Sequence, residues 1–103
     1  MLHIGVLQFC IEIPYATSLK DKRRVVQSLK ERVRREFNVS VAEIDTLDDM
    51  TLATLGVAMT GNDIPYINGA LDKLLNTLHD SRDGTLSDHQ LEIFTPTIGG
   101  DRA

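Results

Sequence analysis

The chain has 103 residues, is 42% hydrophobic and 25% charged, and carries a net charge of −4 at pH 7, as expected for one globular domain with a single core. Its one cysteine, Cys10, excludes an internal disulfide and a multi-cysteine metal site. No apolar run approaches the roughly 20 residues of a membrane helix, and the N-terminus does not resemble a signal peptide, so we expect no membrane partner and a cytoplasmic location.

The first half of the chain predicts a strand, a helix and a second strand. Residues 2–13 are rich in aliphatic side chains and predict the first strand. Ser18 suits a helix N-cap, and Asp21 follows it three residues later, which is close to a capping box. Residues 19–37 then show helical periodicity, and residues 38–45 alternate as a strand does.

The second half also predicts a strand, a helix and a strand. Residues 51–60 predict a third strand and residues 64–80 a second helix with an apolar stripe. Residues 81–87 are polar and predict a loop, which leads into a fourth strand at 89–95. Residues 96–103 predict a flexible C-terminal tail.

This order of elements predicts an α+β domain with the ferredoxin-like βαββαβ fold. In that fold four antiparallel strands form one sheet, and both helices cover the same face of it. We therefore expect a single ferredoxin-like domain over residues 1–95, with no internal repeat.

The second face of the predicted sheet has no helix to cover it. If odd positions of the first strand face the helices, Ile4, Val6 and Cys10 face outward, and Ala58 and Phe94 join them from the third and fourth strands. An exposed apolar patch of this kind is typical of an interface. We therefore predict that these five residues form a homodimer interface on the open sheet face.

Positive charge is concentrated in the first predicted helix. Eight of the eleven Lys and Arg residues lie within sixteen positions beside two acidic residues, for a net charge of +6, whereas the other 87 residues carry three basic and thirteen acidic side chains, for a net charge of −10. The eight basic residues are Lys20, Lys22, Arg23, Arg24, Lys30, Arg32, Arg34 and Arg35. Two interpretations stay open, a solvated outer helix face and a surface that neutralises phosphates.

Three features favour phosphate binding. Acidic partners for i,i+4 pairs are scarce on this helix, so repulsion between its basic side chains is largely uncompensated. Several basic residues lie at the helix N-terminus, where the helix dipole disfavours positive charge. Lys22 falls on the apolar side of the helix, and snorkelling of its ammonium group to solvent is the alternative explanation for it. The predicted nucleic-acid-binding residues are Lys20, Lys22, Arg23, Arg24, Lys30, Arg34 and Arg35.

Several stretches together resemble a known family. Residues 18–24 (SLKDKRR), 37–43 (FNVSVAE) and 55–58 (LGVA), with Asn62 and Asp63, resemble the small bacterial YlxP family, a domain of unknown function. The resemblance extends over about residues 4–94. It implies a ferredoxin-like fold in the cytoplasm. It also implies an association with translation, because members are often encoded among translation and ribosome-maturation genes.

The turn after the second strand departs from the usual pattern of that family. Members usually resemble Gln-Asp-Leu-Trp there, with a basic residue shortly after, whereas this chain has Leu47, Asp48, Asp49 and Met50, with Leu52 in the basic position. If the family uses the aromatic and basic pair for binding, this chain has lost or altered it.

The sequence contains no recognisable catalytic arrangement. Acylphosphatase, an enzyme on this fold, cradles phosphate with Gly and Arg in the loop after the first strand, and residues 14–18 contain neither. The predicted central strands lack the outward aromatic residues on which RNA-recognition motifs stack bases. The three histidines are scattered, and the acidic residues between Glu43 and Asp49 favour a solvated turn over a Mg²⁺ or Ca²⁺ site. We expect no enzyme, no cofactor and no metal.

Two hypotheses of different classes follow from the sequence. In the first, the chain is a non-catalytic binding protein that contacts ribosomal RNA or a ribosomal subunit through its basic helix, mainly at the phosphate backbone. In the second, it is a homo-oligomeric regulatory or scaffold domain that binds a protein or a small metabolite through its open sheet face.

Overall fold

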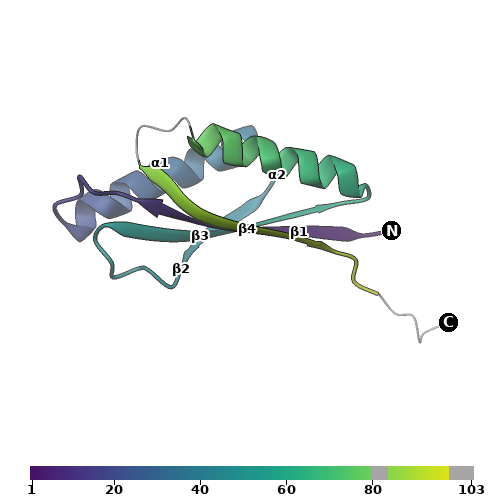
Figure 1. Cartoon of the computed structure of the whole chain (residues 1–103), viewed down its shortest axis with the longest axis horizontal. Helices are drawn as coiled ribbons and strands as arrows, with labels where there is room; N and C mark the ends of the chain where they lie inside the picture. The colour runs from purple at the N-terminus through teal and green to yellow at the C-terminus, as the bar shows by residue number, and fades with distance from the viewer. Residues whose placement is uncertain (80–83, 98–103) are drawn as a thin grey trace.

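The computed structural model describes residues 1–79 and 84–97, and its six elements follow one another in the predicted order. They are β1 (His3–Glu12), α1 (Leu19–Glu36), β2 (Ser40–Ile44), β3 (Leu52–Gly61), α2 (Ile64–His79) and β4 (Thr85–Phe94). The strands form one sheet in the order β2-β3-β1-β4, with every neighbouring pair antiparallel. Both helices lie on one face of this sheet (Figure 1), so the ferredoxin-like α+β fold is confirmed.

β1 is a central strand, and its side chains alternate between the two faces of the sheet. Leu7, Phe9 and Ile11 are buried beneath the helices, whereas Val6 and Gln8 are exposed on the open face. This alternation follows from the pleat of the strand and confirms that odd positions of β1 face the helices. The largest fully buried apolar side chains of the core are Leu7, Phe9, Ile11, Leu29, Leu55, Ile67, Leu71, Leu74 and Leu78.

α1 begins at the predicted N-cap. Ser18 Oγ accepts a hydrogen bond from the Asp21 N–H at 3.0 Å. The Asp21 carboxylate reaches back to Thr17 and accepts from its hydroxyl at 2.6 Å and from its N–H at 3.3 Å. These hydrogen bonds, chiefly the one from the Thr17 hydroxyl, lower the pKa of Asp21 below its ordinary value. The first turn therefore holds a negative charge at the positive end of the helix dipole, beside the basic residues that follow.

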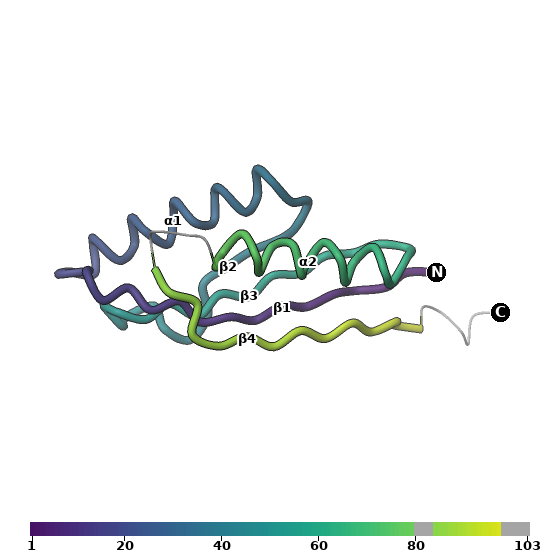
Figure 2. Tube along the Cα trace, turned by 45° about the horizontal axis from the view of Figure 1, so that its top comes forward, coloured from purple at the N-terminus to yellow at the C-terminus, as the bar shows by residue number. Residues whose placement is uncertain are grey.

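The two helices cover different parts of the sheet. α1 contacts the edge strand β2, whereas α2 contacts β1, β3 and β4. Figure 2 shows the helices side by side above the strands. This division brings the basic helix to the β2 edge of the molecule.

β4 begins earlier than the sequence indicates. Residues 85–87 fall in the predicted polar loop, but they form the first part of the strand, where Thr85 faces Glu12 and Leu86 faces Ile11. The register between β1 and β4 shifts between Cys10 and Ile11. The shift interrupts the period-2 alternation of β4 in a stretch that is already polar, so the sequence does not reveal the start of the strand. Residue 80 of the predicted second helix, residues 81–83 of the predicted loop and most of the predicted tail (98–103) lie outside the described residues.

β1 and α2 approach closely at Gly5, where a Cβ atom would lie 2.5 Å from Ile67 Cγ2 and 2.8 Å from Leu71 Cδ1. We expect Gly5→Ala to lower the free energy of unfolding by about 1–3 kcal/mol, because the packed helix would have to shift. Gly69, within α2, has no atom within 4 Å of such a Cβ. Gly69→Ala should therefore raise the stability by about 0.5–1 kcal/mol. Urea unfolding of both variants measures the difference, and equal effects would contradict this packing.

Candidate nucleic-acid interface

One group of basic residues on α1 points away from the sheet. Lys20, Arg24 and Arg35 are exposed and recur at helical spacing on the side opposite the buried residues Val26 and Val33. We call these three residues the outward row. Their side chains are free to approach a large partner, because no other element of the described chain covers this side of α1.

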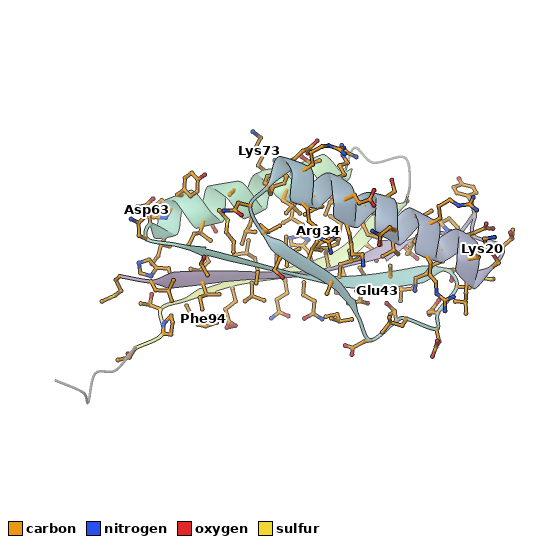
Figure 3. The ribbon with its side chains drawn as sticks, turned by 180° about the vertical axis from the view of Figure 1, so that it is seen from behind. Lys20, Arg34, Glu43, Asp63, Lys73 and Phe94 are labelled. Carbon is orange, nitrogen blue, oxygen red and sulfur yellow. The ribbon has the colours of Figure 1, made fainter. Side chains whose placement is uncertain are left out.

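A second group lies on the flank of α1 beside β2. Arg34 Nη2 donates a hydrogen bond to the carbonyl oxygen of Val41 at 3.3 Å, and Figure 3 shows Arg34 between the helix and the sheet. Arg23 and Lys30 line a groove of about 400 Å³ between α1 and β2. We call Arg23, Lys30 and Arg34 the edge row. The other residues that line the groove are Val26, Gln27, Ala42, Glu43 and Leu47.

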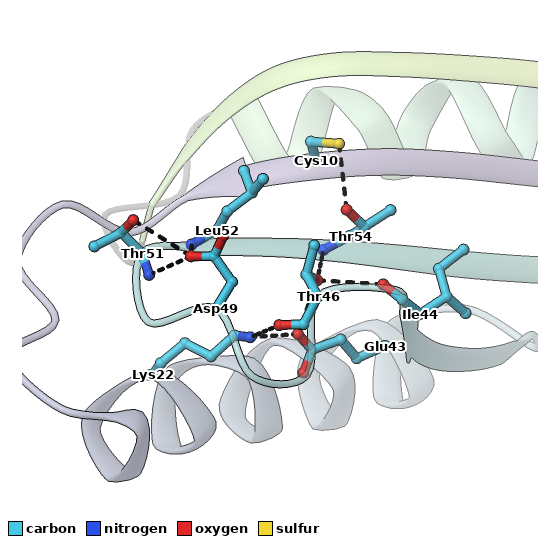
Figure 4. Close-up of polar contacts among 9 residues, drawn as sticks. All are labelled: Cys10, Lys22, Glu43, Ile44, Thr46, Asp49, Thr51, Leu52 and Thr54. Carbon is cyan, nitrogen blue, oxygen red and sulfur yellow. Dashed lines mark hydrogen bonds and ion pairs between the residues drawn. The ribbon is translucent and has the colours of Figure 1, made fainter.

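Lys22 belongs to neither group, because its side chain is 0% exposed. Its Nζ lies 2.5 Å from Glu43 Oε2 and donates a hydrogen bond to the Thr46 carbonyl oxygen at 2.5 Å (Figure 4). The prediction that Lys22 binds nucleic acid is therefore wrong, and so is the alternative that its ammonium group snorkels to solvent. The ammonium group turns inward because a carboxylate and a carbonyl compensate its charge there.

The ion pair is part of a polar network that joins four segments of the chain. The Thr46 hydroxyl donates to Glu43 Oε2 at 3.0 Å and accepts from the Thr54 N–H at 2.7 Å. Asp45 adopts a left-handed conformation with φ of 62°, which turns the chain sharply after β2 and brings Thr46 back towards β3. The network thus links α1, β2, the following turn and β3.

The alternation along β2 contains a signal for this network that the sequence reading missed. Val39, Val41 and Glu43 are two residues apart, so all three face the helices, and Val41 is buried. A carboxylate on the core face and a lysine on the apolar side of α1 are each unfavourable alone. Together they indicate a buried pair, so Glu43 belongs to the packing of α1 on β2 and not to the solvated acidic turn.

The rest of the acidic turn is stabilised by its own hydrogen bonds. Asp49 Oδ1 accepts from the Thr51 N–H at 2.9 Å and from the Leu52 N–H at 3.1 Å. Within residues 1–79 and 84–97, no group of three or more His, Cys, Asp or Glu side chains is placed to hold a metal ion. The turn therefore has a structural explanation that requires no cation.

The open sheet face brings four of the five predicted interface residues together. Ile4 lies opposite Phe94, and Val6 lies opposite Ala58. Val6 is 36% exposed and Phe94 44% exposed. Cys10 is farther along β1, beyond Gln8, with its Sγ 3.5 Å from Thr54 Oγ1. A hollow of about 240 Å³ lies on this face and is lined by Val6, Gln8, Gln90, Glu92 and Phe94.

Comparisons with known proteins identify a family. A sequence profile described as "Protein of unknown function (DUF503)" matches residues 4–91. The chain belongs to the DUF503 family. This description agrees with a domain of unknown function, and the narrower YlxP resemblance stays a prediction. A search of curated proteins found no match.

One solved structure with a related shape gives this DUF503 chain no functional assignment. It is the crystal structure of SnoaB, a cofactor-independent oxygenase from Streptomyces nogalater. The similarity covers 93% of each chain at 13% sequence identity, with a TM-score of 0.43. We draw nothing from a likeness at that level. Among the described helices of the DUF503 chain, none is long and apolar enough to cross a membrane.

The Lys22–Glu43 pair yields a stability prediction. Lys22→Met would leave the Glu43 carboxylate, which is 8% exposed, without its cation, and we expect a loss of about 3–5 kcal/mol in the free energy of unfolding. Lys22→Met combined with Glu43→Leu should recover most of that loss, because no buried charge then remains unpaired. Urea unfolding measures both. Lys20→Met, at an exposed position of the same helix, should change the stability by less than about 0.5 kcal/mol; a similar loss there would contradict the assignment.

Proposed function

We propose that this DUF503 chain is a non-catalytic RNA-binding protein of the cytoplasm, which contacts ribosomal RNA or a ribosomal subunit through the outward row of α1. The observation that carries the proposal is the set of exposed cations without intramolecular partners. Within the described residues only two ion pairs form, Lys22–Glu43 and Arg32–Glu36. Lys20, Arg24 and Arg35 therefore present their charge to solvent, where it can neutralise phosphates and release counterions.

The distribution of charge over the whole molecule supports a polyanionic partner. After Lys22 is withdrawn, the outward and edge rows still place six cations on one helix of a protein whose net charge is −4. A positive face on an acidic body orients the protein toward RNA and limits non-specific coating. Neither central strand carries an aromatic residue on the open face for base stacking, so contacts to the phosphate backbone dominate this mode of binding.

The turn that departs from the YlxP pattern lies at the same end of the molecule as Lys20. Leu47 and Met50 are exposed there, and Leu52 is half-buried at the start of β3. An exposed Met offers apolar contact but no aromatic ring, and Leu52 supplies no cation. In this chain, the RNA contact that we propose therefore depends on α1 alone. The link to translation comes from the YlxP resemblance.

Salt dependence tests the proposal. If the three residues of the outward row each neutralise one phosphate, the logarithm of the affinity should fall with the logarithm of salt with a slope of about −2.7, or about 40-fold between 50 and 200 mM. Arg24→Glu should reduce the slope by about 1 and weaken binding to isolated ribosomal subunits. Filter binding or fluorescence anisotropy with structured ribosomal RNA measures both quantities.

The matched control for that experiment is Lys73→Glu. Lys73 is exposed on α2, beside Glu36 at the opposite end of α1 from Lys20 and Arg24, and its reversal changes the net charge by the same amount. It should leave the slope unchanged. An equal loss from both variants would mean diffuse attraction, and the absence of binding by the unmodified protein at about 50 mM salt would reject the proposal.

The open sheet face favours a second candidate function, a homo-oligomeric regulatory or scaffold domain that binds a protein or a small metabolite. The specific observation is the exposure of Val6 and Phe94 beside the hollow on this face. Apolar side chains grouped on one uncovered face are typical of an interface between copies.

The second candidate predicts a dimer in solution that the open face holds together. Phe94→Glu should convert it to a monomer, because a charge would be buried between the two sheets. Tyr66→Glu, at an exposed aromatic residue on α2, should leave the dimer intact. Sedimentation at low and high salt measures the mass. A monomer under all conditions would contradict this candidate.

A further inference from the structure

β2 lies at one edge of the sheet, so only one of its sides is paired. Its paired side faces β3, with Ala42 opposite Gly56. Arg34 reaches the Val41 carbonyl from the flank of α1, so this carbonyl points away from β3. In an antiparallel strand the N–H and C=O of one residue point to the same side, and the side alternates along the strand. Val41 and Glu43 therefore direct their backbone groups to the outer edge, where an extended chain can pair with them.

The groove beside this edge is positively charged. Arg23 and Lys30 line it and form no ion pair within the described residues. The one carboxylate in its lining, that of Glu43, is already engaged by Lys22 and by the Thr46 hydroxyl. Arg23 and Lys30 therefore have no carboxylate in the groove to pair with, and they can attract one from a partner.

We propose that the β2 edge and its groove bind an extended acidic segment of a partner protein, which adds to the sheet as a further strand next to β2. Backbone hydrogen bonds to Val41 and Glu43 would supply affinity, and side chains on the helix-facing side would enter the groove. Such side chains recur about every 6.7 Å along a strand. Lys30 and Arg34 are about 6 Å apart along the helix axis, so carboxylates two residues apart match these cations.

Arg34 and Leu47 extend the fit at either end of the site. In the structure Arg34 covers the Val41 carbonyl, so the arriving strand must displace it. The displaced guanidinium is then available for a carboxylate, which forms a charge-assisted hydrogen bond stronger than the one it replaces. Leu47 lines the groove and is 59% exposed, and it offers an apolar contact to a hydrophobic residue of the segment.

The charge at the two sheet edges selects β2 for this partner. β4 forms the other edge of the sheet. Its residues on the open face include Asp88 and Glu92, whose charges would repel an acidic segment. RNA has no peptide groups that could continue the ladder of β2. This inference therefore goes beyond the proposed RNA contact, which uses the outward row, and the two can fail separately.

The test uses the full chain labelled with ¹⁵N and a short synthetic peptide in which Glu alternates with Val. We expect the largest amide shifts and slowed hydrogen exchange at Val41 and Glu43, and binding that weakens with salt. A peptide with Lys in place of Glu should not bind. Absence of binding at millimolar peptide, or shifts confined to β4 or to the outward row, would overturn the inference.

Two variants with equal charge change separate this site from the RNA surface. Lys30→Glu should lower the affinity for the acidic peptide by about tenfold, whereas Lys20→Glu should leave that affinity within about twofold of the unmodified protein's. The opposite ranking is expected for ribosomal RNA, because Lys20 belongs to the outward row. If ribosomal RNA shifts the amides of the outward row but the peptide leaves the Val41 and Glu43 amides unchanged, the strand-addition site is rejected while the RNA-binding proposal stands.

Discussion

The buried ion pair between Lys22 and Glu43 is the constraint on which the arrangement of this molecule depends. A charge removed from water must be paired and hydrogen-bonded, so Lys22 holds α1 against β2 where the Glu43 carboxylate faces the core. Thr46 completes the network and ties it to β3 through Thr54. Once Lys22 points inward, helical geometry determines where every other basic residue of α1 must point.

The ion pair therefore separates one run of positive charge into surfaces with different chemistry. The outward row faces solvent on the side of α1 away from the sheet, where we propose contact with the phosphates of a large RNA. The edge row lies beside the groove and the unpaired edge of β2, where a polypeptide can form backbone hydrogen bonds that RNA cannot form. The fold alone assigns neither partner, because ferredoxin-like domains serve many functions; the side chains of the two rows distinguish the two partners.

The open sheet face is independent of α1 and combines two kinds of surface. Its apolar end, around Val6 and Phe94, resembles half of an interface, whereas Gln8 and Gln90 face each other farther along. A polar middle keeps a face with no helix over it compatible with water. A second copy that covers this face would leave both rows of α1 accessible, because the helices lie on the opposite side of the sheet. Dimer formation and binding by α1 are therefore compatible.

The sequence by itself determined the order of elements, the N-cap at Ser18 and the faces of β1, because these depend on local periodicity and capping. Only the tertiary structure decided that Lys22 is buried, since its partner lies 21 positions along the chain, and that β4 starts at Thr85, since pairing with β1 extends it through a register shift. The division of the basic residues into two rows was likewise decided by packing. Which side of α1 faces solvent depends on which side packs against the sheet, and local sequence does not decide that.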